Sequence, residues 1–165
     1  MAKAALIVPI LILLCMLASC NNEKEGTGYA GFLELLTESG FMYSELETPI
    51  VREFSAAETK PIKVWAEGEF VYDFDPNDPS EREEFSAALV RRGLWIYEFD
   101  SNEQMESNSA LVSSDGYNIG GRNYSYIGRP RFFKRDRIIV VYQGENEQII
   151  NFLRDTLGEK FAGVG

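Results

Sequence analysis

Arg137-Ile138-Ile139-Val140-Val141-Tyr142-Gln143 is the strongest strand signal in the chain. Its β-branched and aromatic residues favour an extended backbone. The run is apolar without alternation, which is typical of a strand that is covered on both faces. We therefore expect this stretch to be a central strand of the sheet, with the remaining elements arranged around it.

Outward from this strand, further stretches alternate or cluster apolar residues in the manner of strands. We expect strands at residues 41–46, 62–65, 70–74, 94–99, 122–127 and 131–133. Glu67-Gly68 is a turn signal, so residues 62–65 and 70–74 are predicted to form a hairpin. The stretch from Pro49 to Ala57 has no clear period and stays ambiguous.

Four stretches carry helical spacing with start or stop signals. Tyr29 to Ser39 is followed by Gly40. A second helix follows the caps Asp78 or Ser80 and is closed by Gly93. The remaining two are a short helix capped by Asp100 or Ser101 that ends at Ser114-Asp115-Gly116, and Glu145 to Leu157, which Gly158 closes.

Strand signals that lie next to each other in sequence outnumber strand–helix–strand units, which favours antiparallel pairing. We predict a single α+β domain over residues 29–165, with a mainly antiparallel sheet and about four packed helices. A chain of this length can bury a hydrophobic core without further support.

The N-terminal 20 residues have a different composition from the rest. Lys3 precedes an apolar run from Ala4 to Ala18, and the run ends in small residues. This layout is typical of a secretory signal peptide, and the run is shorter than the roughly 20 residues of a spanning helix. Leu17-Ala18-Ser19-Cys20 resembles the lipobox of bacterial lipoproteins.

That resemblance implies cleavage before Cys20 and lipidation of its thiol, which would anchor the mature chain in a membrane. Residues 1–19 would be the signal peptide and residues 20–28 a lipidated cysteine with a polar tether. Asn21 is not the Asp that usually retains such proteins at the inner membrane. We therefore expect an extracytoplasmic, membrane-anchored protein of the cell envelope, in the outer membrane if the host has one.

A second resemblance covers Leu94 to Gly163. The order Ser114-Asp115-Gly116, then an aromatic-rich segment, then FFKRDRIIVVYQG from Phe132 and LGEKFAG from Leu157 is similar to an uncharacterised family of small bacterial lipoproteins. It implies a compact α+β domain and no catalytic residues.

Residue composition excludes several kinds of chemistry. The chain has no His, and its two cysteines lie at positions 15 and 20. Histidine catalysis is thus excluded, and zinc, copper or haem sites are not expected, so we predict no cofactor. Residues 20–115 hold 7 basic and 21 acidic side chains, whereas residues 116–165 hold 8 and 5. The overall acidity argues against nucleic acid as a partner.

Asp73, Asp75, Asn77 and Glu84 stand at positions 1, 3, 5 and 12 of a candidate calcium loop. A hard cation requires six to eight oxygen ligands, and these side chains supply oxygens at suitable spacing. Position 6 is Asp78 where such loops require Gly. The alternative is an acidic strand-to-helix connection whose carboxylates cap the next helix.

The segment from Arg122 to Arg137 is basic and aromatic, with six positive charges against Asp136 alone. Arginine beside aromatic residues is enriched at binding surfaces. The residues that we expect to contact an envelope protein or an anionic ligand are Arg122, Tyr124, Arg129, Arg131, Lys134 and Arg135. The alternative is a pair of amphipathic strands whose arginines face water.

The function that these features favour is that of a non-catalytic, lipid-anchored binding module of the cell envelope. Two alternatives remain open: an envelope hydrolase that works through carboxylates, and a calcium-stabilised surface module. A buried Asp or Glu with a raised pKa in a cleft would favour the enzyme. With 26 acidic residues in the chain, no pair of carboxylates stands out as catalytic.

Overall fold

The computed structural model describes residues 27–46, 53–54, 56–65, 93–126 and 128–165. Within them, one six-stranded antiparallel sheet has the order β1-β2-β3-β7-β6-β8, and three helices pack on it. The single α+β domain with an antiparallel sheet is confirmed. Of the four predicted helices, the one expected between Asp78 and Gly93 lies outside the described residues.

The strands of the main sheet follow the chain in three groups. Their bounds are β1 Met42–Glu45, β2 Glu58–Trp65, β3 Gly93–Glu98, β6 Arg131–Arg135, β7 Ile138–Tyr142 and β8 Ala162–Gly163. A separate two-stranded hairpin consists of β4 Asn118–Ile119 and β5 Arg122–Asn123. The helices are α2 Tyr29–Glu38, α4 Asn102–Ser109 and α5 Glu147–Leu157.

The strand β7 lies inside the sheet, between β3 and β6, as its apolar run predicts. All five of its residues are buried. Ile138, Val140 and Tyr142 belong to one hydrophobic core, and Ile139 and Val141 to a second core. Successive side chains of a strand point to opposite faces, so the sheet separates two cores and β7 contributes to both.

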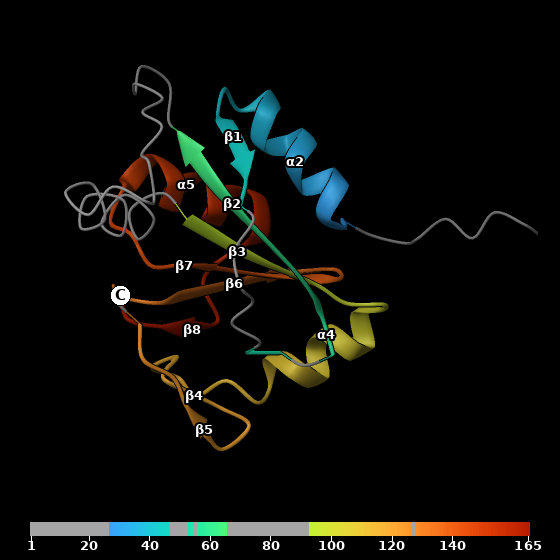
Figure 1. The fold of residues 1–165 in the computed structure, drawn as a ribbon, viewed down its shortest axis with the longest axis vertical. Coiled ribbons are helices and arrows are strands. Elements are labelled where there is room, and N and C mark those ends of the chain that lie inside the picture. The colour runs from blue at the N-terminus through green and yellow to red at the C-terminus, as the bar shows by residue number, and fades with distance from the viewer. Residues whose placement is uncertain (1–26, 47–52, 55, 66–92, 127) are drawn as a thin grey trace, which may run out of the picture.

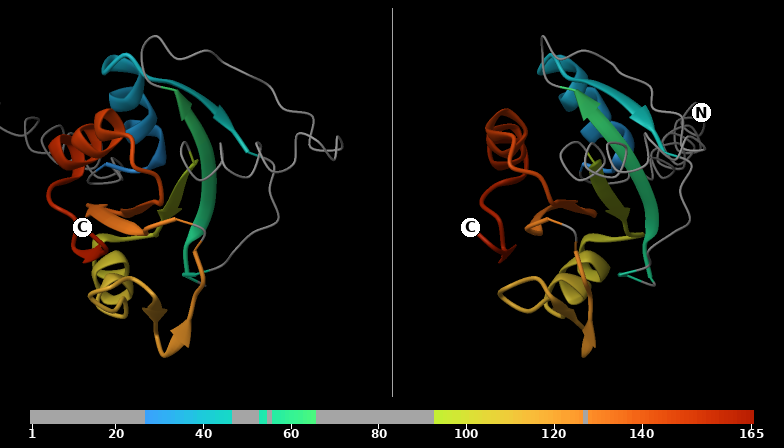
Figure 2. Two further views of the ribbon diagram at one scale, coloured as in Figure 1. Left: turned by 90° about the vertical axis from the view of Figure 1, so that its left-hand side faces the viewer. Right: turned by 60° about the vertical axis from the view of Figure 1, so that its left-hand side comes forward.

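Helices α2 and α5 cover one face of the sheet, while α4 and the β4–β5 hairpin lie on the other (Figure 1). Phe32 and Leu36 of α2 pack in the first core with Leu153 of α5. Met105 of α4 and Ile119 of β4 pack in the second core. Figure 2 shows the same division, with the β4–β5 hairpin extending away from the sheet below α4.

The start of α4 and the end of α5 match the cap signals of the sequence, whereas α4 ends at Ser109, before the predicted Ser114-Asp115-Gly116. Ser101 accepts a hydrogen bond from the Gln104 N–H at the start of α4, and Asn146 accepts one from the Gln148 N–H at the start of α5. Gly158, at φ +91°, follows the last residue of α5. The side chains of Ser101 and Asn146 thus satisfy backbone N–H groups that have no partner within the helix.

Strand β2 differs from its prediction. It starts at Glu58, earlier than expected; its residues 58–63 pair with β3, and its C-terminal half, residues 62–65, pairs with β1. Ile62 and Lys63 are thereby paired with β1 on one side and with β3 on the other. The expected hairpin partner, residues 70–74, lies outside the described residues.

Candidate functional site

The Glu53–Arg122 cavity, a pocket of about 260 Å³, lies beside α4 and the β4–β5 hairpin. Its polar lining consists of Glu53, Asn108, Arg122 and Tyr124. Its apolar lining comes mainly from Phe54, Leu111 and Ile119. Ligand sites commonly combine apolar walls with a few polar groups in this way, and at a volume of roughly 300–1,000 Å³. This cavity therefore suits a small ligand.

Local structure explains how the lining is positioned. Asn108 lies in the last turn of α4, where its Nδ2 donates to the Gln104 carbonyl over 2.8 Å. Phe54 and Ile119 are anchored in the second core. Gly120 and Gly121 both have positive φ, at +58° and +82°, and form the turn of the β4–β5 hairpin. The turn thus places Arg122 opposite the core residue Ile119 in the hairpin.

Glu53 is the most perturbed acid of the cavity. Burial raises its pKa to about 7, although hydrogen bonds from its own backbone amide and from the Tyr126 hydroxyl act in the opposite direction. Both the Oε2 atom of Glu53 and the Tyr126 hydroxyl are buried, and the distance and angles between Glu53 and Tyr126 do not meet the criteria for a hydrogen bond. The same burial, together with the charge of Glu53, raises the pKa of Tyr126.

Arg122 is exposed on β5. Neither Arg122 nor Glu53 forms an ion pair with any residue in the part of the chain that the structure describes. The cavity therefore presents one acid and one base that do not neutralise each other. Glu53 is partly buried, and an unpaired, partly buried acid beside an exposed base is a combination that a ligand can satisfy.

The other predicted contact residues lie elsewhere. Arg131 donates to the Gly144 carbonyl over 2.6 Å, and Arg135 donates to the Thr156 carbonyl at the end of α5 over 2.7 Å. Lys134 pairs with Glu106 of α4, and its Nζ lies 5.2 Å from the centre of the Phe161 ring. Lys134 thus contacts α4 and Arg135 contacts α5, and these helices lie on opposite faces of the sheet (Figure 1). The structure does not bring the six residues together on one face.

Arg129 is exposed, and only its backbone N–H has a recorded bond, to the Gln143 carbonyl. Of the predicted binding residues, the cavity therefore brings together Arg122 and Tyr124 alone. Glu53 was missed because it lies in the stretch without a clear period, and nothing in the sequence distinguishes it from 25 other acidic residues.

The predicted calcium ligands Asp73, Asp75, Asn77 and Glu84 lie outside the described residues. So does Cys20, the predicted lipidation site. Among the residues that are described, no group of three or more acidic, Cys or His side chains is gathered in a way that would hold a metal ion. Likewise, no helix in the described ranges is long and apolar enough to span a membrane.

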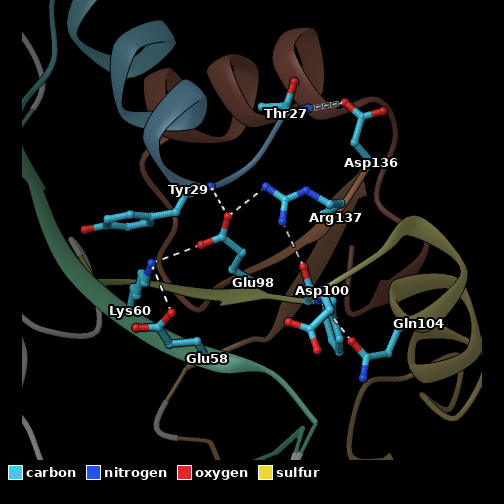
Figure 3. A network of polar contacts seen from close by, with 10 residues as sticks. Thr27, Tyr29, Glu58, Lys60, Glu98, Asp100, Gln104, Asp136 and Arg137 are labelled. Atoms are coloured by element: carbon cyan, nitrogen blue, oxygen red, sulfur yellow. Dashed lines mark hydrogen bonds and ion pairs between the residues drawn. The ribbon is translucent and has the colours of Figure 1, made fainter. Parts of the chain in front are cut away.

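A second polar cluster surrounds Glu98, the last residue of β3, and lies next to the start of α2 (Figure 3). Its carboxylate accepts hydrogen bonds from the Tyr29 N–H at 3.2 Å, Arg137 Nη2 at 3.1 Å and Lys60 Nζ at 3.0 Å. Arg137 also donates to the Phe99 carbonyl. A cavity of about 390 Å³ adjoins this cluster. Arg137 Nε is buried without a hydrogen-bond partner, but the charged groups of the cluster pair with one another. We therefore interpret the cluster as structural.

Comparisons with protein-family models, with curated proteins and with solved structures found no match to this chain. The resemblance of residues 94–163 to small lipoproteins therefore stays a prediction. The site is defined by its own geometry.

Proposed function

We propose that this chain is a lipid-anchored protein of the cell envelope whose folded domain binds a small ligand without transforming it. The lipobox Leu17-Ala18-Ser19-Cys20 supports the anchor. In this proposal the mature protein starts at Cys20 and lies outside the cytoplasm, in the outer membrane where the host has one. The short polar stretch before Thr27 holds the domain close to the membrane surface.

The observation that carries the binding function is the Glu53–Arg122 cavity. Within the described residues, this cavity has a concave, partly apolar surface on which Glu53 and Arg122 converge without an ion-pair partner. The basic-aromatic segment contributes to it through Arg122 and Tyr124. The remaining basic residues of that segment, apart from Arg129, bind carbonyl or carboxylate groups of the domain itself.

The anchor is tested by fractionating cells that express the wild-type chain or Cys20→Ala. The wild type is expected in the membrane fraction with a mass increased by its acyl groups, and the variant in the soluble extracytoplasmic fraction or as an uncleaved precursor. A wild-type chain that carries no lipid would refute the anchor. Binding is tested separately, by a thermal-shift screen of small molecules against the full chain in detergent.

An envelope hydrolase is the second candidate, because the pKa of Glu53, at about 7, suits a general acid. Hydrolysis of a glycosidic bond ordinarily requires two carboxyl groups. Glu53 is the one acidic residue that lines the cavity among the described residues. A screen that finds turnover which Glu53→Gln abolishes would favour this candidate, whereas weaker binding without turnover would favour the binding module.

The calcium-stabilised module is a third proposal, and it depends on Asp73, Asp75, Asn77 and Glu84. A rise in melting temperature with added calcium, absent in Asp75→Asn, would support it.

A further inference from the structure

The Glu53–Arg122 cavity offers a carboxyl group and a guanidinium group to the same ligand. Both side chains line a space of about 260 Å³ and no ion pair joins them. A ligand with one positive charge would be attracted by Glu53 and repelled by Arg122. A ligand with one negative charge would be attracted by Arg122 and repelled by Glu53, because opposite charges attract and like charges repel.

We propose that the cavity binds a small zwitterion, a molecule with one amino group and one carboxylate, such as a free amino acid or a short peptide. This inference rests on the proposed binding function and specifies its ligand. The ammonium group of the ligand pairs with the Glu53 carboxylate, and its carboxylate pairs with the Arg122 guanidinium, which is suited to hold two oxygens at once.

The remaining lining fits the rest of such a molecule. Phe54, Leu111 and Ile119 present an apolar surface that accommodates an aliphatic or aromatic side chain. Leu111 is 52% exposed, which is unusual for a large apolar residue in the described domain and consistent with contact to a ligand. Tyr124 and Asn108 supply hydrogen-bonding groups beside the charged pair. A zwitterion therefore satisfies both charged groups without a counter-ion.

The experiment is calorimetric titration of the full chain in detergent with three matched sets of probes. The first set is the common amino acids, with the dipeptides Ala-Ala and Leu-Leu. The second set consists of the same molecules without the amino group. The third set consists of the same molecules without the carboxylate. We expect at least one zwitterion to bind, and each single-charge analogue of it to bind at least tenfold more weakly.

Two variants assign the charges. Glu53→Gln is expected to weaken binding of the zwitterion at least tenfold but to strengthen binding of the analogue without an amino group, because the repulsion between Glu53 and its carboxylate is removed. Arg122→Gln is expected to weaken binding of the zwitterion similarly and to strengthen binding of the analogue without a carboxylate, for the corresponding reason. Arg129→Gln, which alters an exposed arginine outside the cavity, is the matched control and should change nothing.

Acidity supplies an independent readout. Burial raises the pKa of Glu53 to about 7, so the zwitterion should bind several-fold more tightly at pH 7.5 than at pH 6. Among the residues that the structure describes, the other titratable and charged groups around Glu53 are Arg122, Tyr124 and Tyr126. Arginine and tyrosine side chains do not ordinarily titrate between these two pH values. Glu53→Gln should remove the dependence.

Three results would overturn the inference. They are equal binding of a zwitterion and one of its single-charge analogues, binding of a zwitterion that neither Glu53→Gln nor Arg122→Gln weakens, and no binding of any zwitterion at millimolar concentration. A neutral ligand found in the thermal-shift screen, weakened by the same variants, would refute the zwitterion and leave the proposed binding function intact. Loss of the membrane anchor would refute the proposed localisation alone.

Discussion

The Arg137 guanidinium donates from Nη2 to Oε1 of Glu98 over 3.1 Å, and both side chains are largely buried. Arg137 lies in the two-residue turn between β6 and β7, whereas Glu98 is the last residue of β3. The same Glu98 oxygen accepts the Tyr29 N–H at the start of α2. One ion pair thus connects the central hairpin, the neighbouring strand and the first described helix.

Replacing Arg137 by Met is expected to destabilise the domain by about 3 kcal/mol. The loss arises because the largely buried carboxylate of Glu98 loses one of its two cationic partners, Lys60 being the other. Removing one partner of a buried ion pair costs more than the ion pair itself contributes. The measurement is the free energy of unfolding in urea. Arg129→Met, which removes an exposed arginine, is the control and should change that free energy by no more than about 0.5 kcal/mol. Equal effects of the two variants would contradict the structural role of Arg137.

Glu98 should make the domain sensitive to acid. Burial alone raises its pKa, but the hydrogen bonds from Lys60 and the Tyr29 N–H, and the charges of Lys60 and Arg137, together lower it below its ordinary value. A carboxyl group with a lowered pKa in the folded state stabilises that state above its unfolded pKa of about 4.5, and this contribution is lost as the pH falls further.

Unfolding of the wild type and Glu98→Gln should therefore be compared from pH 7 down to pH 3. The wild type is expected to be the more stable at pH 7, and the gap should narrow steadily below about pH 4.5. A gap that is constant over the whole range would show that the charge of Glu98 contributes nothing.

Gly28 is required by its neighbours and not by its backbone, since its φ is −94°. A Cβ atom there would lie 2.5 Å from Oε1 of Glu98 and would also overlap Nη2 of Arg137. Gly28→Ala is thus expected to displace the ion pair and to cost about 2 kcal/mol.

Gly31, in the first turn of α2, is the matched control for Gly28. The nearest atom to a Cβ at Gly31 is Cγ2 of Thr27 at 3.7 Å, an ordinary contact. Gly31→Ala should stabilise the domain by about 0.5 kcal/mol, because Ala favours a helix over Gly. Thermal unfolding of both variants should shift the midpoint in opposite directions. A shift in the same direction would argue against close packing at Gly28.

Local signals predicted the elements well. The apolar run of β7, the cap Ser101 and the closing Gly158 all depend on neighbouring residues, so they could be predicted from the sequence. The pairing of β2 with β3 joins stretches separated by more than 25 residues. No local pattern specifies such a contact, because it depends on which strand buries the most surface.

The candidate site, too, could be predicted only where local sequence signals determine it. The basic-aromatic segment was expected to form one contact surface, but Lys134 and Arg135 are neighbours on a strand and so point to opposite faces. Arg122 and Tyr124 were predicted as contact residues from composition, and they line the cavity. Glu53, which lines the same cavity, comes from a distant stretch, and its raised pKa results from burial, which the sequence does not display.

Glu53→Gln gives the last prediction, and its effect should depend on pH. Because burial raises the pKa of Glu53 to about 7, the folded state binds this proton more tightly than the unfolded state does. The folded protein therefore loses stability as the pH rises from about 4.5 to about 7, and the loss stays constant above that range. A difference of 2.5 pKa units corresponds to roughly 3 kcal/mol.

Gln keeps the shape of the side chain and cannot ionise, so Glu53→Gln removes this cost. The variant should match the wild type near pH 4 and exceed its unfolding free energy by up to about 3 kcal/mol at pH 8. Urea unfolding at both pH values measures the difference, and Glu103→Gln on the exposed face of α4 is the control. A Glu53→Gln variant that is less stable than the wild type at pH 8 would show that the carboxylate is satisfied inside the protein, and the case for a ligand at this position would then fail.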